Sequence, residues 1–142
     1  MRKEIEKLLQ SVQKPARYAG GELNSVMKDK SKVALRYAFC FPDTYEIGMS
    51  HLGMKILYGV ANAREDTWCE RVFAPADDME ALMRANGEPL FALESGDPIK
   101  DFDMIGLTMQ YELSYTNILN MLDLAGVPLR AGDRKSLTPI VA

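Results

Sequence analysis

The order of hydrophobic segments after residue 32 most constrains the fold of this chain. Short runs rich in β-branched and aromatic residues alternate there with longer segments of helical spacing. The expected strands are 33–40, 67–73, 89–94 and 103–109, and the expected helices are 51–63, 76–87 and 114–126. Strands separated by helices of about 10 to 15 residues pair in parallel through right-handed connections. The pattern therefore predicts an α/β domain with three layers and a doubly wound, mainly parallel sheet of the flavodoxin-like type, in strand order 2-1-3-4-5.

Local signals support the three helices. One face of the first helix gathers its apolar residues: Leu52, Ile56, Leu57 and Val60. The second helix has acids in its first turn and Gly87 at its end, as the helix dipole and C-cap geometry prefer. For the third, Ser114 or Thr116 is the expected N-cap and Gly126 the expected stop.

The two ends of the chain differ from this regular part. Residues 2–12 have the spacing of a short amphipathic helix, and the stretch up to residue 31 has no period, so we expect an N-terminal helix followed by an irregular arm. The last residues, PIVA, are typical of a buried strand that is only beginning. We therefore expect an arm over 1–31 and an α/β domain over 32–142, truncated before the end of its last strand and belonging to a longer polypeptide.

Composition excludes several classes of function. A chain of 142 residues with 47% hydrophobic content can bury the core of one domain. Its net charge of -3 and scattered basic residues disfavour nucleic acid, and no apolar run is long enough for a membrane span. Cys40 and Cys69 are too few for a disulfide framework, and the N-terminus has no signal peptide, so a cytoplasmic location is expected.

Ligands of doubly wound domains bind at the carboxyl ends of the strands, where the winding reverses. The segment FPDTYEIGMSHLG follows the first expected strand and QYE follows the fourth. The expected ligand-binding residues are therefore Asp43, Tyr45, Glu46, Gly48, Met49, His51, Gln110, Tyr111 and Glu112, with Glu94 at the same edge. Because acids prevail and no glycine-rich phosphate motif is present, nucleotide binding is disfavoured. A phospho-acceptor receiver is disfavoured too, because it needs an aspartate where Glu94 stands.

Taken singly, these residues have simpler explanations. A lone histidine at a helix start, such as His51, is more often a capping or packing residue than a general base or metal ligand. The acids could form a solvated rim, and the cysteines are most simply core residues. Gly48 and Gly53 indicate close approach of the backbone or a turn with positive φ. The sequence thus predicts no catalytic residue and no metal site in this chain.

Several long stretches resemble one known family. The runs KPARYAGGELNSV, AFCFPDTYEIGMSHLGMKILYGVAN, CERVFAPADDMEALMRANGEPLFALES and DFDMIGLTMQYELSYTNILNMLDLAGVPLR look like the N-terminal region of bacterial radical SAM proteins that contain a B12-binding domain. The resemblance covers residues 14–142. It implies a cobalamin-binding-like Rossmann domain placed ahead of a radical SAM barrel, its partner in the same polypeptide. The barrel of the parent enzyme would carry a 4Fe-4S cluster and S-adenosylmethionine.

The chain also departs from this pattern. Cobalamin domains with a histidine ligand carry D-x-H-x-x-G, whereas His51 has no aspartate two residues before it and only one residue before Gly53, so it is not carried over as a cobalt ligand. The S-x-L of those domains is replaced by Thr108, Met109 and Gln110. The C-x-x-x-C-x-x-C cluster motif is absent, so this chain alone is expected to be non-catalytic.

Two functions follow from the sequence. In the first, the domain binds, or formerly bound, a corrinoid at the carboxyl edge of its sheet through the nine residues named above. A corrin is a large apolar disc fringed by neutral amides, so it needs a hydrophobic floor and hydrogen-bonding side chains. In the second, the domain is a non-catalytic docking module that orients the barrel or another partner without a cofactor.

Overall fold

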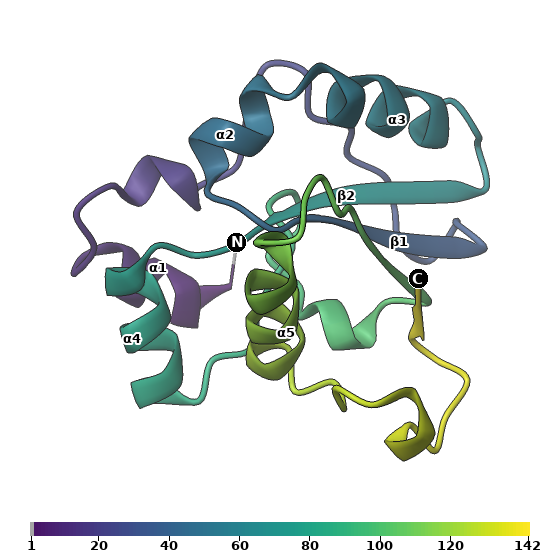
Figure 1. Cartoon of the computed structure of the whole chain (residues 1–142). Coiled ribbons are helices and arrows are strands. Elements are labelled where there is room, and N and C mark those ends of the chain that lie inside the picture. The colour runs from purple at the N-terminus through teal and green to yellow at the C-terminus, as the bar shows by residue number, and fades with distance from the viewer. Residues whose placement is uncertain (1) are drawn as a thin grey trace.

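A computed structural model describes residues 2–142 of the chain (Figure 1). Its four strands form one parallel sheet in the order β2-β1-β3-β4. The strands are β1 (Leu35–Phe41), β2 (Thr67–Phe73), β3 (Met104–Leu107) and β4 (Ile140–Val141). The helices are α1 (Lys3–Leu9), α2 (Tyr45–Ser50), α3 (Leu52–Asn62), α4 (Asp77–Asn86) and α5 (Ser114–Leu124). Short 3-10 turns lie at Pro15–Arg17, Ile99–Asp101 and Ala131–Asp133.

Helices cover both faces of the sheet. Helices α2 and α3 lie on one face, here called the α3 face, and α4 and α5 lie on the other, the α5 face (Figure 1). Strand β1 contributes side chains to both faces, because alternate side chains of a strand point to opposite faces. Phe39 and Phe41 join the core under α3, whereas Ala38 and Cys40 join the core over α5. The predicted three-layer, doubly wound α/β fold is confirmed.

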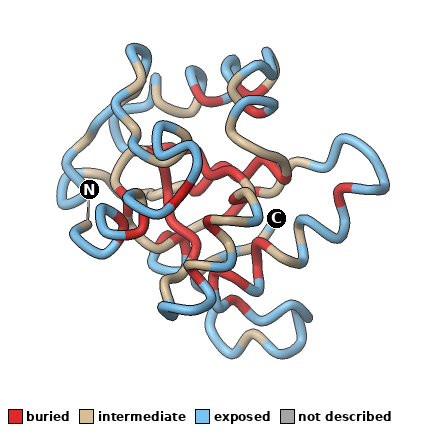
Figure 2. Tube along the Cα trace, turned by 90° about the vertical axis from the view of Figure 1, so that its left-hand side faces the viewer, coloured by how far each residue is buried: buried red, intermediate tan, exposed pale blue. Residues whose placement is uncertain are grey.

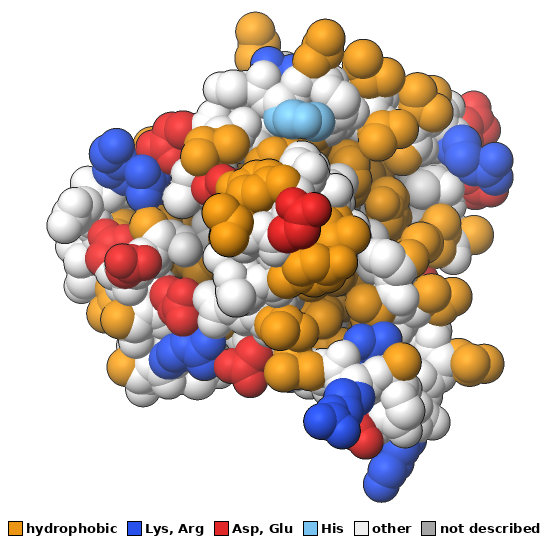
Figure 3. All heavy atoms as spheres, viewed as in Figure 1, with side chains coloured by type: hydrophobic (Ala, Val, Ile, Leu, Met, Phe, Trp, Pro, Cys, Tyr) orange, Lys and Arg blue, Asp and Glu red, His pale blue; other side chains and the backbone are white. Residues whose placement is uncertain are grey.

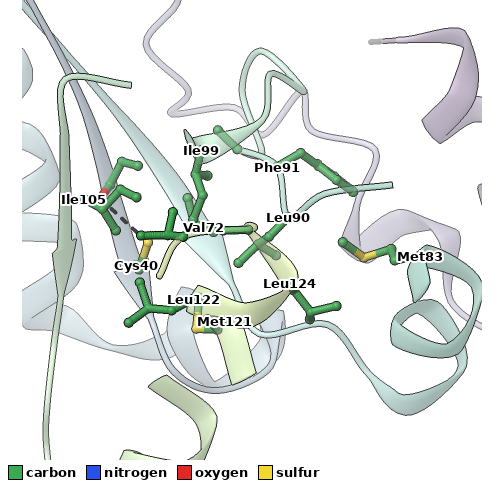
Figure 4. Close-up of a cluster of buried hydrophobic side chains, with 14 of the residues drawn as sticks. Cys40, Val72, Met83, Leu90, Phe91, Ile99, Ile105, Met121, Leu122 and Leu124 are labelled. Atoms are coloured by element: carbon green, nitrogen blue, oxygen red, sulfur yellow. Dashed lines mark hydrogen bonds between the residues drawn. The ribbon is translucent and has the colours of Figure 1, made fainter. Parts of the chain in front are cut away.

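Two hydrophobic cores hold these layers together. The larger core lies on the α5 face, and Figure 4 shows side chains from the strands, α4, α5 and the 90–99 segment converging there. The smaller core lies on the α3 face and consists of Phe39, Phe41, Met54, Tyr58, Cys69, Phe73 and Leu93. In Figure 2 the buried residues accordingly run through the centre of the molecule, with exposed loops around them. None of the helices within residues 2–142 has the length and apolar character needed to cross a membrane.

The expected strand over 89–94 is not formed, which corrects that prediction. This segment runs beside the open edge of β2, where the Leu93 amide donates to the Arg71 carbonyl at 2.8 Å. The next ladder position is taken by a side chain, because the Arg71 amide donates to the Glu94 carboxylate at 2.7 Å. A side chain in the place of a backbone carbonyl stops the ladder. The other four expected strands are formed in the predicted order, which is β2-β1-β3-β4 once the 89–94 segment is left out.

Helix α3 forms where predicted, but it buries a different face. Met54 and Tyr58 of this helix pack against the sheet and are 2% and 4% exposed. The Tyr58 hydroxyl accepts a hydrogen bond from the Val26 amide at 2.7 Å. The predicted apolar face is solvent-exposed, from 55% to 69%: Leu52, Ile56, Leu57 and Val60. Because this helix carries apolar residues on two sides, periodicity could not tell which side meets the sheet.

Other local predictions had mixed outcomes. Gly87 and Gly126 follow their helices with φ of 66° and 69°, so both predicted stops are confirmed. The expected cap of α5 is wrong, because Leu113 occupies the N-cap position and no side chain caps it. The segment after β1 folds into the short helix α2, which was not among the expected helices. The irregular arm packs along β2, where Lys28 donates to three backbone carbonyls near the end of α3 and the start of β2.

Candidate functional site

The carboxyl ends of the parallel strands β1, β2 and β3 meet at one edge of the sheet. The chain passes from β1 to β2 across the α3 face and from β2 to β3 across the α5 face, so the winding reverses between β1 and β3. Ligands of this architecture bind at such a switch point. The segments concerned are residues 42–51 after β1, 74–76 after β2 and 108–113 after β3.

Two predicted residues of α2 serve to seat this helix on the sheet. The ring of Tyr45 packs edge-on against Phe73 with centroids 5.6 Å apart. Gly48 is buried, and a Cβ added there would lie 2.2 Å from a ring carbon of Phe73. Glycine at this position thus permits the close approach that the sequence suggested.

Two others connect α2 to the arm and to β2. Glu46 accepts a hydrogen bond from Arg17 at 2.9 Å and lies 3.5 Å from Lys14. The hydrogen bond from Arg17 lowers the pKa of Glu46 below its ordinary value. The sulfur of Met49 lies 3.4 Å from a guanidinium nitrogen of Arg71. Both side chains are engaged by neighbouring residues, Glu46 at the surface and Met49 in a half-buried position.

His51 lies between α2 and α3 at the end of the β1 segment. Its Nδ1 accepts the Met54 amide at 3.2 Å, which makes it the N-cap of α3. Its ring packs on Phe41 with centroids 5.1 Å apart. The interpretation of His51 as a capping and packing residue is therefore confirmed.

The predicted residues after β3 form an exposed group. Gln110, Tyr111 and Glu112, with Met109 and Tyr115, line a hollow of about 220 Å³. Tyr111 is 51% exposed, and the large apolar side chains nearby are exposed too: Met109, Leu113, Tyr115 and Leu119. Figure 3 shows hydrophobic side chains gathered around an acidic one over the start of α5. No lysine or arginine occurs in the 108–115 or 43–54 segments.

A second, larger hollow of about 530 Å³ lies at the same edge, between the ends of β1 and β2 and the helices α4 and α5. Of the nine predicted residues, only Asp43 lines it. Its walls come from the arm, the two strand ends and the two helices: Gln13, Lys14, Arg17, Thr44, Ala74, Pro75, Ala76, Asp77, Asp78, Glu80, Asn117 and Asn120. The Asn117 amide donates to the Pro42 carbonyl at 2.8 Å and joins α5 to the β1 end.

Three of the nine predicted residues thus line the smaller hollow and Asp43 lines the larger one, whereas the other five line neither of the two. Sequence reasoning missed the contribution of Asn117 and Asn120, whose spacing of three residues on a predicted helix was the available signal. The placement of Glu94 at this edge was wrong. The side chain of that residue is 0% exposed and pairs with Arg71 of β2 at 2.6 Å. Burial raises the pKa of Glu94 above its ordinary value, against the opposing effect of Arg71.

No metal centre is evident within residues 2–142, where no cluster of three or more His, Cys, Asp or Glu side chains is arranged to hold an ion. Cys40 and Cys69 are free and buried, as expected of core residues. Burial raises the pKa of Cys69 to about 12, and the pKa of Cys40 is raised by the same cause.

The fold and this edge define a doubly wound α/β domain with an acidic and aromatic rim at its switch point. Residues 53–142 match the family model described as radical SAM proteins, N-terminal. The chain belongs to this family. Comparison with curated proteins and with solved structures found no match. Membership makes the chain a domain of a radical SAM protein, the class whose parent polypeptides carry a 4Fe-4S cluster and S-adenosylmethionine.

Proposed function

We propose that this N-terminal domain holds a corrinoid at the carboxyl ends of β1 and β3, next to the radical SAM domain of the same polypeptide. One observation carries the proposal. The 43–54 and 108–115 segments at the switch point present exposed apolar and hydrogen-bonding side chains, and neither segment contains a lysine or an arginine. A phosphate-dominated ligand would require positive charge there, whereas a corrin requires an apolar floor and partners for its amides.

The residues present fit such a group in chemical kind. Gln110, Tyr111 and Glu112 would offer donors and acceptors to the amide fringe, and Leu52, which is 69% exposed, would contribute to the floor. The imidazole of His51 is committed to capping α3 through Nδ1, and its motif lacks the residues that accompany a cobalt ligand. When bound, cobalamin supplies a cobalt centre able to transfer a methyl group or an electron.

The other predicted residues would act from behind this surface. Tyr45 and Gly48 keep α2 against Phe73, and Glu46 and Met49 tie it to Arg17 and Arg71. They would position the β1 segment without touching the corrin. Asp43 faces the larger hollow, where the acids outnumber the bases and hydrogen-bond donors of a ligand would be favoured.

Titration of the full-length polypeptide with hydroxocobalamin, followed by calorimetry and by the visible spectrum, tests this proposal. We expect saturable binding, and we expect Tyr111→Ala to weaken it at least tenfold, because an aromatic side chain at the centre of a contact carries much of its energy. Leu137→Ala is the matched control, since Leu137 is 90% exposed and precedes β4 on the opposite edge. Absence of saturable binding in the full-length protein would remove cobalamin from the account.

A second candidate function is favoured by the apolar character of the same surface. Five large side chains after β3 and on α5 are 47% to 78% exposed: Met109, Tyr111, Leu113, Tyr115 and Leu119. Such an exposed group is typical of a protein interface. As a docking module without cofactor, the domain would leave hydroxocobalamin unbound, and Tyr111→Ala would lower the melting temperature of the full-length protein. Tyr45 is unsuitable for this test, because its ring packs inside the fold.

A further inference from the structure

On the α3 face, the smaller core contains side chains of β1 and β2, and within residues 2–142 no side chain of β3 or β4 belongs to it. Helix α3 packs over β1 and β2, where Met54 and Tyr58 meet the strand residues of the smaller core. The register aligns Tyr37 of β1 with Met104 of β3, and Met104 with Ile140 of β4. Aligned residues of parallel strands point to the same face. Because Tyr37 belongs to the smaller core on the α3 face, Met104 and Ile140 face the same side, and Ile140 is 55% exposed.

The neighbouring flank of α3 is apolar as well. The Asn62 side chain bonds both backbone groups of Cys69, at 2.9 and 3.0 Å, so this flank of the helix is turned toward β2. At 3.6 residues per turn, Leu57 and Val60 lie on the opposite flank, toward β3. They are 55% and 64% exposed. Figure 3 shows hydrophobic side chains continuing from α3 down the side of the molecule toward the C-terminal strand.

We propose that a helix of the same polypeptide, following β4, packs against β3 and β4 on the α3 face, alongside α3. Two apolar walls meet there at an angle, one from the strands and one from the flank of α3, which is the surface that a further helix of a three-layer sandwich buries. Lys55 is the one charged residue of α3. A helix that is apolar nearly all round is buried in its protein, so a single layer of contact with β1 and β2 leaves α3 incompletely covered.

The handedness of the fold selects this occupant. The connections from β2 to β3 and from β3 to β4 cross the α5 face. The connection from β1 to β2, which leads in the opposite direction along the sheet, crosses the α3 face. Both directions are those of right-handed crossovers. Another strand added beyond β4 would place its connection on the α5 face again. The uncovered area is therefore reached by a segment that turns back over the sheet after the last strand. This inference goes beyond the proposed function, because it needs no corrinoid.

Thiol labelling of the full-length polypeptide tests the proposal on a single helix. The variants are L57C and V60C on the flank toward β3, with K55C, at an exposed position elsewhere on the same helix, as the matched control. Labelling is followed site by site by mass spectrometry of peptides, so cysteines elsewhere do not interfere. We expect L57C and V60C to react at least tenfold more slowly than K55C, because protection on one flank alone reports coverage and not helix opening.

Equal labelling rates at the three positions would overturn the proposal. So would protection that disappears on dilution, since a second copy of the protein would then cover the flank. A photoreactive maleimide attached to V60C identifies the occupant. Cross-linking within one molecule to the segment after Ala142 supports the proposal, and cross-linking only between molecules or only within residues 1–142 contradicts it. None of these outcomes depends on cobalamin, so the proposed function stands or falls separately.

Discussion

Replacing Arg71 by methionine should lower the free energy of unfolding more than the same replacement of a surface arginine. The Arg71 side chain is 3% exposed and lies in the middle of β2. Its guanidinium pairs with Glu94 at 2.6 Å, donates to Ser25 at 2.9 Å and lies 4.5 Å from the ring centre of Tyr58. It also lies 3.6 Å from Glu22. One side chain therefore holds the 93–94 segment, the arm and α3 together.

The expected loss follows from what the substitution leaves behind. Methionine fills much of the volume, but the Glu94 side chain, with 0% exposure, loses its charged partner and keeps only the hydrogen bond from the backbone amide of residue 71. Breaking a buried ion pair in this way costs about 3–5 kcal/mol of unfolding free energy. The exposed pair of Arg64 with Asp66, at 2.7 Å, provides the control. Arg64→Met should leave stability unchanged within error, because solvent screens such pairs.

The loss should also depend on pH. Burial raises the pKa of Glu94 above its ordinary value of 4.5. A raised pKa in the folded state means that stability is complete below 4.5 and is lost as the pH rises through the folded value. Removing Arg71 removes the main influence that opposes this rise. The deficit of Arg71→Met relative to the natural protein should therefore be small near pH 4.5 and grow toward pH 8.

Urea unfolding followed by circular dichroism at several pH values measures both effects. Limited trypsin digestion adds a local readout, because a released arm exposes Lys28 and Lys30 to cleavage. If Arg71→Met cost no more than Arg64→Met, or if its deficit shrank as the pH rose, the reasoning from the buried pair would be refuted.

Three further predictions concern single positions, and thermal or urea unfolding checks the first two. Gly48→Ala should destabilise the protein by about 1–3 kcal/mol because its Cβ meets an aromatic ring, whereas Gly59→Ala, with nothing within 4 Å, should stabilise it by about 0.5–1 kcal/mol. His51→Ala should cost about 1 kcal/mol through loss of the N-cap, and His51→Asn should retain most of that stability. Cys40 and Cys69 should stay unreactive toward a thiol reagent at pH 8 until denaturant is added, because burial raises the pKa of both thiols.

Local pattern was sufficient for most of the secondary structure. The predicted strand over 67–73 coincides with β2, and the predicted helix over 76–87 exceeds α4 by one residue at each end. Such segments are defined by periodicity and by their own end residues, and Gly87 adopts the left-handed conformation that its position requires. The 89–94 segment failed for the opposite reason, because the Glu94 side chain takes a ladder position through its contact with Arg71, 23 residues away.

The candidate site was predictable in place but only partly in composition. Parallel strands bring their carboxyl ends to one edge, so the segments after β1 and β3 could be named from order alone. The side chains of these two segments differ in whether they are exposed or engaged by other residues. Gln110, Tyr111 and Glu112 remain exposed, whereas Tyr45 is packed against Phe73 and Glu46 pairs with Arg17.

The sequence by itself determined the layered α/β class, the sheet edge that forms the candidate site and the likeness to radical SAM proteins, because these depend on residue order and local spacing. Tertiary structure decided which side of α3 meets the sheet, which acids pair inside the protein and which aromatic residues face outward. Those choices depend on partners far apart in the chain. An amphipathic pattern records that a residue can be buried, whereas the competition among neighbouring surfaces determines whether it is.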